Sequence, residues 1–273
     1  MRKVWHPREV TAPPLAGYGA GMLRTSLRAS LPSSATRPAV SAVAVSLGAL
    51  FYAVGRLRRG RRKPLHPDGA VVAGTVHRDG TPSPWGAPWL DATGEHEATV
   101  RLSRSAGLPP PLPDVLGMAL RVRVDGRDAD LLLSSTGRGR VGRFLLRPRT
   151  APGRGIYTTL LPYRSPRGPV LIAAEPEQPR QLPPDPAELA EHLAAEPMRF
   201  ALSCAAPQGP WQQFGTVEIG RQVGPPSTGA GVDAPISFDP VLNPLPGLQM
   251  YDVVARIRAR TYASARRARG LPG

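Results

Sequence analysis

The chain has 273 residues, 41% of them apolar, which is an ordinary composition for a globular protein with one large domain or two small ones. Its 34 prolines and 29 glycines favour short elements joined by turns over long helices. The single cysteine, Cys204, excludes an internal disulfide and a cysteine-based zinc or iron–sulfur site. We expect Cys204 to be a small buried residue in a strand, not a nucleophile.

The formal net charge of +15 is concentrated near the start of the chain. Residues 1–63 contain 12 basic residues and one acidic residue, whereas residues 64–273 contain 23 basic and 19 acidic residues. The larger part of the chain is therefore only mildly basic, and the excess is more typical of membrane orientation or of a disordered tail. Aromatic residues make up only 5% of the chain, so few side chains could stack on bases, and we expect no specific nucleic-acid partner.

The first 62 residues divide into two segments by composition. Residues 1–37 are rich in Pro, Gly, Ser, Ala and Arg without periodicity, so we expect them to be disordered. Residues 38–55 are uncharged and would span about 27 Å as a helix at ~1.5 Å per residue, slightly less than the ~30 Å hydrocarbon core of a bilayer. The basic residues that follow, up to residue 62, would hold the main domain, residues 63–273, in the cytoplasm. We expect inner-membrane association through 38–55; the alternative is a helix that packs on the domain.

From residue 69 onward the sequence consists mainly of β-branched and apolar runs between turns. The expected strands are residues 69–76, 98–102, 119–124, 130–133, 169–174, 200–205 and 214–219. The alternating run that ends at Asp125-Gly126 predicts a tight hairpin. Seven to eight short strands of this kind predict a closed or nearly closed antiparallel barrel.

Two helices are expected beside the strands. Residues 185–193 begin with an aspartate cap and a proline in the first turn. Residues 249–269 place Met250, Val253 or Val254, and Ile257 on one helical stripe. The predicted fold class is therefore α+β, an antiparallel β-barrel of about eight strands with C-terminal helices.

Four short segments contain the polar residues that could carry chemistry. In chain order they are residues 63–69 (KPLHPDG), 100–103 (VRLS), 113–121 (PDVLGMALR) and 258–262 (RARTY). Their order and the distances between them resemble the haem pocket of the catalases. The resemblance covers about residues 63–164 and 236–269, and it implies a catalase-like barrel that binds one haem b.

The resemblance assigns three residues to peroxide chemistry. His66 corresponds to the distal histidine, which takes a proton from bound peroxide and returns it to the leaving oxygen. Ser103 corresponds to the serine that orients this imidazole. Catalases also carry an asparagine that orients peroxide above the iron, but residues 130–136 (DLLLSST) offer Ser134, followed by Ser135, in its place. A hydroxyl is shorter than an amide and lacks its pair of donors. We therefore expect weak catalase activity and a peroxidase activity on hydrogen peroxide or organic hydroperoxides.

Four further residues are implied in haem binding. Arg101, which shares a strand face with Ser103, and Lys63 correspond to bases that hold the propionates; a guanidinium suits a carboxylate because its donors form a planar fork. Tyr262 corresponds to the axial ligand of the haem iron. Arg258 lies four residues earlier on the same helical face, where it would favour the phenolate.

Two other interpretations compete with this one. A catalase-like barrel without haem could serve as a non-catalytic scaffold at the membrane. A phosphodiester hydrolase would need clustered metal ligands, but the five histidines are scattered and lack metal-ligand spacing, so we consider this class unlikely. The oligomeric state is left open by the sequence.

Overall fold

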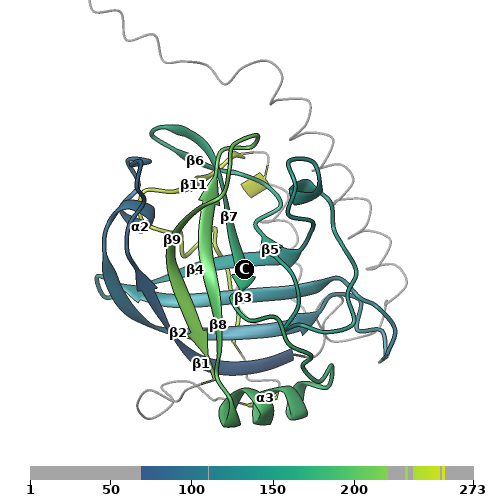
Figure 1. Cartoon of the computed structure of the whole chain (residues 1–273). Helices are drawn as coiled ribbons and strands as arrows, with labels where there is room; N and C mark the ends of the chain where they lie inside the picture. The colour runs from purple at the N-terminus through teal and green to yellow at the C-terminus, as the bar shows by residue number, and fades with distance from the viewer. Residues whose placement is uncertain (1–68, 110, 221–230, 233–235, 253, 256–273) are drawn as a thin grey trace, which may run out of the picture. The chain divides into compact units, whose positions relative to one another are not determined.

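The computed structural model describes residues 69–109, 111–220, 231–232, 236–252 and 254–255. Within them, eight antiparallel strands pair in the order β1-β2-β3-β4-β5-β7-β8-β9, and β9 pairs with β1, so the sheet closes into a barrel (Figure 1). The strands are β1 (Gly69–Arg78), β2 (Gly94–Arg104), β3 (Leu116–Val124), β4 (Arg127–Ser135), β5 (Tyr157–Thr158), β7 (Gly168–Pro176), β8 (Met198–Ala205) and β9 (Gln212–Ile219). Every strand predicted from the sequence lies within one of them.

Smaller elements lie beside the barrel strands. Strand β6 (Tyr163–Ser165) pairs with β7 and with β11 (Gln249–Met250), and β10 (Gly231–Val232) pairs with β1. The helical elements are α2 (Pro88–Asp91), the 3-10 turn η1 (Gly142–Phe144) and α3 (Pro186–Ala195). The predicted fold class, an antiparallel barrel of about eight strands in an α+β protein, is confirmed.

The barrel interior is a packed apolar core. Along β2 the side chains of Ala98, Val100 and Leu102 are buried in this core, while those of the residues between them are partly exposed on the outer face. This alternation is what a strand produces when one face of the sheet is inside a barrel. Burying each Val or Leu contributes roughly 1.5–3 kcal/mol. Cys204 is fully buried in the core on β8, as expected.

Turns and caps follow the local chemistry of the sequence. Asp125 and Gly126 have φ angles of 50° and 75°, as a two-residue hairpin with matching twist requires. Helix α3 begins after Asp185, whose carboxylate accepts hydrogen bonds from the N–H groups of Ala187 (2.9 Å) and Glu188 (3.2 Å). Both the hairpin and this helix are confirmed.

The predicted C-terminal helix over 249–269 starts too early. Residues 249 and 250 form β11, where Met250 pairs with Tyr163, and helical structure begins at residue 252. The backbone ladder with β6 overrides the helical spacing of Met250. Residues 256–269 lie outside the described part of the chain, as do the segments 1–37 and 38–62, so the predicted domain limits stay predictions. Among the described residues, no helix has the length and apolar character needed to cross a bilayer.

Candidate functional site

Three of the predicted site residues lie on the outer face of one side of the barrel. Arg101 and Ser103 alternate with Val100 and Leu102, which belong to the core, so both point away from the barrel interior. Ser134 alternates in the same way with core residues of β4. The expectation that Arg101 and Ser103 share a face is therefore confirmed, and Ser134 shares that face with them.

Strand register places the two serines in one row across four strands. Gly69 pairs with Ser103, Ser103 with Gly117, and Gly117 with Ser134. Directly paired residues project to the same side of a sheet. The backbones of Ser103 and Ser134 are thus two strands apart, roughly 9–10 Å at 4.7–4.9 Å per strand. Because the residue between them is a glycine, no side chain separates the two hydroxyl groups along the row.

Arg101 lies across the first residue of this row. A Cβ atom added to Gly69 would be 2.8 Å from the guanidinium carbon of Arg101 and 2.7 Å from the backbone oxygen of Leu102. Only glycine leaves room for this path of the arginine. The guanidinium therefore lies next to the start of β1, three residues after His66 in the sequence.

The neighbouring serine, Ser135, has a different role. Its side chain is fully buried, its hydroxyl donates to the Arg147 carbonyl oxygen (2.8 Å), and it accepts from the Leu116 N–H (2.9 Å). These two hydrogen bonds connect the loop after β4 to the start of β3. Of the two consecutive serines, only Ser134 is thus available on the outer face.

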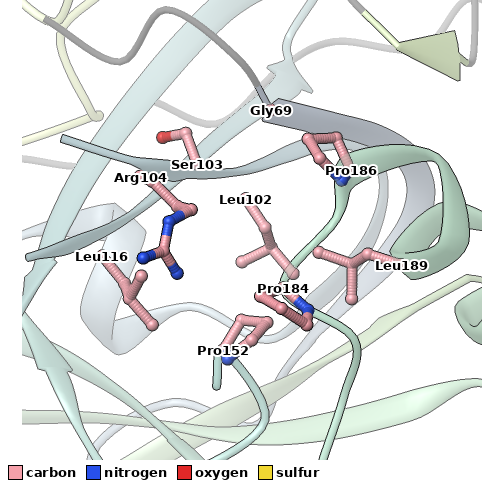
Figure 2. Close-up of a pocket in the computed structure, with 9 residues that line it drawn as sticks. All are labelled: Gly69, Leu102, Ser103, Arg104, Leu116, Pro152, Pro184, Pro186 and Leu189. Carbon is pink, nitrogen blue, oxygen red and sulfur yellow. The ribbon is translucent and has the colours of Figure 1, made fainter. Parts of the chain in front are cut away.

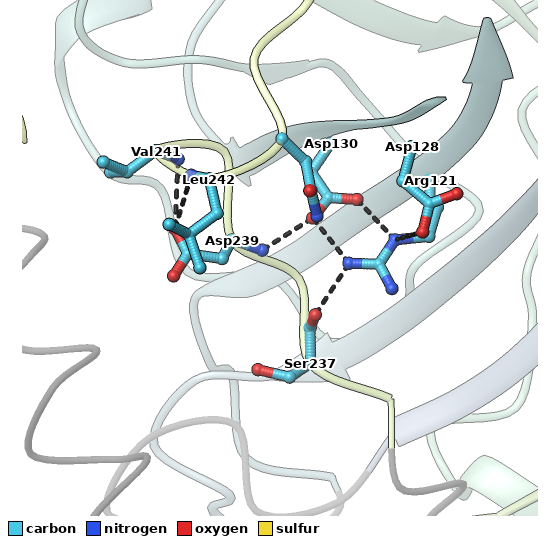
Figure 3. Close-up of polar contacts among 8 residues, drawn as sticks. Arg121, Asp128, Asp130, Ser237, Asp239, Val241 and Leu242 are labelled. Atoms are coloured by element: carbon cyan, nitrogen blue, oxygen red, sulfur yellow. Dashed lines mark hydrogen bonds and ion pairs between the residues drawn. The ribbon is translucent and has the colours of Figure 1, made fainter. Parts of the chain in front are cut away.

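The same outer face ends in a buried ion pair at the other end of β3 and β4 (Figure 3). Arg121 donates from Nε and Nη2 to the two carboxylate oxygens of Asp130, both at 2.7 Å, and Asp130 is 0% exposed. The Asp239 N–H (2.6 Å) and the side-chain amide of Asn243 (2.9 Å) also donate to Asp130. Arg121 donates to the backbone carbonyl oxygen of Ser237 (2.7 Å). The hydrogen bonds from Arg121 to the carboxylate raise the pKa of this arginine, although burial opposes the shift.

This ion pair fixes residues 237–243 against β3 and β4. Sequence reasoning placed residues 130–136 and 236–269 within the resemblance but missed the contact between Asp130 and Asp239. A signal was present, because Arg121 and Asp130 are equally far from the Asp125-Gly126 turn, which makes them direct partners in the hairpin.

One small cavity lies next to the site, and a larger cleft lies away from it. The small one (Figure 2) measures about 20 Å³ and is lined by Gly69, Ser103 and Arg104, and the Nη1 atom of Arg104 is buried without a hydrogen-bond partner. It has room for about one water molecule. A wide cleft of about 1370 Å³ lies at the opposite end of β3, lined by its hairpin and by residues 242–249. Arg101 and Ser134 border neither cavity.

The other predicted site residues, Lys63, His66, Arg258 and Tyr262, lie outside the described residues. The structure therefore brings together Arg101, Ser103 and Ser134 and leaves the proposed distal base and axial ligand as predictions. Among the residues that the structure describes, no three His, Cys, Asp or Glu side chains are grouped so that they could hold a metal ion.

Comparison with known proteins finds solved structures with a similar fold. No protein-family model matches the sequence, and no curated protein sequence matches it. Among solved structures, a fungal catalase matches with a TM-score of 0.57 and 13% identity over 81% of this chain and 62% of that chain. Catalase A from Saccharomyces cerevisiae matches with a TM-score of 0.55 and 12% identity over 81% and 64%.

At this level of identity, the likeness shows the fold alone. The chain is a catalase-like antiparallel β-barrel protein. It spans less than two thirds of the length of either catalase.

Proposed function

We propose that this protein is a haem-dependent peroxidase with weak catalase activity, acting on hydrogen peroxide or on an organic hydroperoxide. The observation that carries the proposal is the row of Gly69, Ser103, Gly117 and Ser134 on the outer wall of a catalase-like barrel. The row is a floor with little side-chain volume, because Gly117 lies between the two serines and Gly69 lies beside Arg101 at one end. Such a floor fits one face of a flat macrocycle with a carboxylate at its edge.

Each residue has a definite task in this proposal. Arg101 and Lys63 hold the haem propionates, and the planar fork of Arg101 suits a carboxylate. Tyr262 would ligate the iron, and Arg258 would favour the phenolate form of this ligand. When bound, the haem supplies the redox chemistry of its iron.

The proton is moved by the chain itself. His66 accepts a proton from one oxygen of the peroxide and donates it to the other oxygen, which leaves as water or as an alcohol. Ser103 orients the imidazole. Ser134 donates one hydrogen bond to the peroxide and, being smaller than an asparagine, leaves space for an alkyl group.

An absorption spectrum of the full chain supplied with haem tests the proposal. A Soret band is expected at one haem per chain, and Tyr262→Phe should abolish or strongly alter it. Tyr251→Phe is the matched control, because the Tyr251 ring packs against Arg164 (5.0 Å) and its loss should leave the band unchanged. His66→Ala should keep the band and lower peroxide turnover. A band that is insensitive to Tyr262→Phe would contradict the ligand assignment.

A haem-free barrel that serves as a scaffold at the membrane is the alternative function. It is favoured by the serine at position 134, where catalases carry an asparagine. A full chain that folds but shows no Soret band with excess haem would establish this alternative over the peroxidase.

A further inference from the structure

Two loops meet at one end of the barrel. Because β2 to β5 are antiparallel neighbours, the loop after β2 (residues 105–115) and the loop after β4 (residues 136–156) leave the barrel at the same end. They are joined by paired backbone hydrogen bonds between Asp114 and Arg149, at 3.0 and 2.8 Å. We call the surface of these loops the apolar rim and define it by Leu108, Leu112, Arg140, Val141, Leu145 and Arg147.

Large apolar side chains are exposed on this rim. Leu108 is 41% exposed, Leu112 50%, Val141 71% and Leu145 56%. In the described part of the chain, only two other large hydrophobic residues are exposed, Val241 and Leu242. Exposed apolar groups that gather on one part of a surface mark an interaction site.

The same loops carry a strong positive charge. Residues 136–156 contain six arginines and no acidic residue. The one acid of residues 105–115, Asp114, is buried, and its carboxylate accepts from the N–H groups of Ala106 (2.9 Å) and Leu108 (3.1 Å). Within these two loops no exposed acidic residue offsets the arginines, although Arg138 pairs with Glu175 of β7 (3.3 Å).

The arginines divide into structural and available ones. Arg143 is buried and donates to the carbonyl oxygens of Ala206 and Gly209, and Arg149 donates to that of Thr136. Arg140 and Arg147 are exposed, and no acidic side chain among the described residues pairs with them. Arg140 directly precedes Val141, and Arg147 lies two residues after Leu145, so both arginines belong to the rim and are available to a partner.

We propose that the apolar rim binds the surface of a bilayer that contains anionic lipids. Leucine and valine side chains insert below the headgroups, and adjacent guanidinium groups bind the lipid phosphates, as in other peripheral membrane proteins. A nucleic acid would use exposed aromatic side chains for stacking, and the exposed large hydrophobic residues of the rim are all aliphatic. The inference is independent of the haem proposal and of the hydrophobic segment 38–55.

The test must report on the rim itself, because residues 38–55 could bind vesicles on their own. We would label the full-length Leu145→Cys variant with an environment-sensitive fluorophore and use the labelled Leu242→Cys variant as the control, since Leu242 is 67% exposed and lies away from the rim. Cys204 can stay in place, because it is fully buried and burial raises the pKa of its thiol to about 12.

With vesicles of equal parts phosphatidylglycerol and phosphatidylcholine, emission should shift to the blue at position 145 and stay unchanged at position 242. Replacing both Arg140 and Arg147 by Glu should weaken the vesicle dependence of this shift by at least ~10-fold, since each arginine near an anionic surface adds substantially to binding. Replacing Arg123 and Arg127, which are exposed on the β3–β4 hairpin at the opposite end, should leave it unchanged.

Three results would overturn the proposal. The first is no shift at position 145, and the second is an equal shift at positions 145 and 242. The third is an equal shift with single-stranded RNA in place of vesicles, which would assign the rim to a nucleic acid.

Discussion

The outer wall of β3 and β4 has two ends with opposite chemistry. At one end, Gly117 and Ser134 form a pair with little side-chain volume and one hydroxyl group. At the other end, Arg121 and Asp130 form an ion pair that residues 237–243 cover. The two pairs are only four residues apart along each strand.

The contrast separates a structural surface from a candidate binding surface. Both oxygens of the buried Asp130 carboxylate accept hydrogen bonds, so a ligand would find no polar atom of this carboxylate to bind. The row of small residues and hydroxyl groups at the opposite end of the strands is the surface to which the proposed function assigns a ligand. The following predictions test this division, from the largest expected effect to the smallest.

Removing the Asp130 carboxylate should have the largest effect on stability. In Asp130→Ala, the partly buried Arg121 and the donors from Asp239 and Asn243 lose their acceptor. Breaking one side of a buried ion pair costs ~3–5 kcal/mol of unfolding free energy. Urea unfolding of the full chain, followed by tryptophan fluorescence, measures the change.

The matched control is Asp128→Ala. Asp128 also lies near Arg121, at 3.6 Å from Nε, but its side chain is 42% exposed. An exposed pair of this kind contributes about 0–1 kcal/mol. Equal losses in the two variants would show that the burial of Asp130 does not set its contribution.

The two adjacent serines should respond very differently to truncation. Ser135→Ala leaves the buried Leu116 N–H and the Arg147 carbonyl oxygen without their partner, which costs about 1–3 kcal/mol of unfolding free energy. Ser134→Ala, on the outer face, should change it by less than about 0.5 kcal/mol. Denaturant midpoints of both variants decide the matter, and a large loss in Ser134→Ala would mean that this hydroxyl has a structural role.

Local sequence patterns predict which residues lie on the outer face of β2 and β4 and how β3 and β4 pair. The alternation along β2 and β4 determines which side chains face outward, and the Asp125-Gly126 turn fixes the register in which Gly117 faces Ser134. The register of β2 against β3 could not be predicted, because an 11-residue loop joins them and its geometry depends on the buried Asp114. The row that links Ser103 to Ser134 therefore became visible only in the structure.

The shortest elements and the ends of the chain escaped sequence reasoning for other reasons. Strands β5, β6 and β11 have two or three residues, too few to show a periodic pattern. Their formation depends on neighbours distant in the sequence, as the pairing of Met250 with Tyr163 shows. The roles of His66 and Tyr262 come from the family resemblance alone and stay predictions.

Replacing Ser134 by the asparagine that catalases carry tests the candidate binding surface. Under the proposed function, Ser134→Asn places a two-proton donor where the resemblance expects it, and we predict about 5-fold faster dismutation of hydrogen peroxide, which corresponds to the ~1 kcal/mol of one added hydrogen bond. Oxygen evolution per haem is the measurement. Turnover of a bulky organic hydroperoxide should fall in the same variant, because the larger side chain occupies the space beside Gly117. A rise for both substrates would argue against a steric role for Ser134.

The smallest effect on stability is expected at Asp91. Its carboxylate accepts hydrogen bonds from neutral donors, whereas that of Asp130 accepts them from an arginine. Burial acts to raise the pKa of Asp91, but hydrogen bonds from the Thr81 hydroxyl (2.6 Å) and the N–H groups of Trp85 (2.9 Å) and Ala87 (3.0 Å) outweigh it, so the pKa lies below its ordinary value. A carboxyl group whose pKa is lower in the folded state stabilises the fold above its unfolded pKa of ~3.9, and this contribution disappears as the pH falls through the folded value.

Unfolding free energies measured between pH 6 and pH 2.5 should therefore fall less steeply for Asp91→Asn than for the unmodified chain. Glu97→Gln, at an exposed position of β2, is the control and should leave the slope unchanged. At pH 6 the Asp91→Asn variant should be the less stable protein, because its one amide oxygen can replace only one of the two carboxylate oxygens that accept these hydrogen bonds, and the amide nitrogen cannot accept. The two curves should converge at the acid end. Parallel curves would show that Asp91 has the same proton affinity in the folded and unfolded chain, and that its hydrogen bonds add no pH-dependent stability.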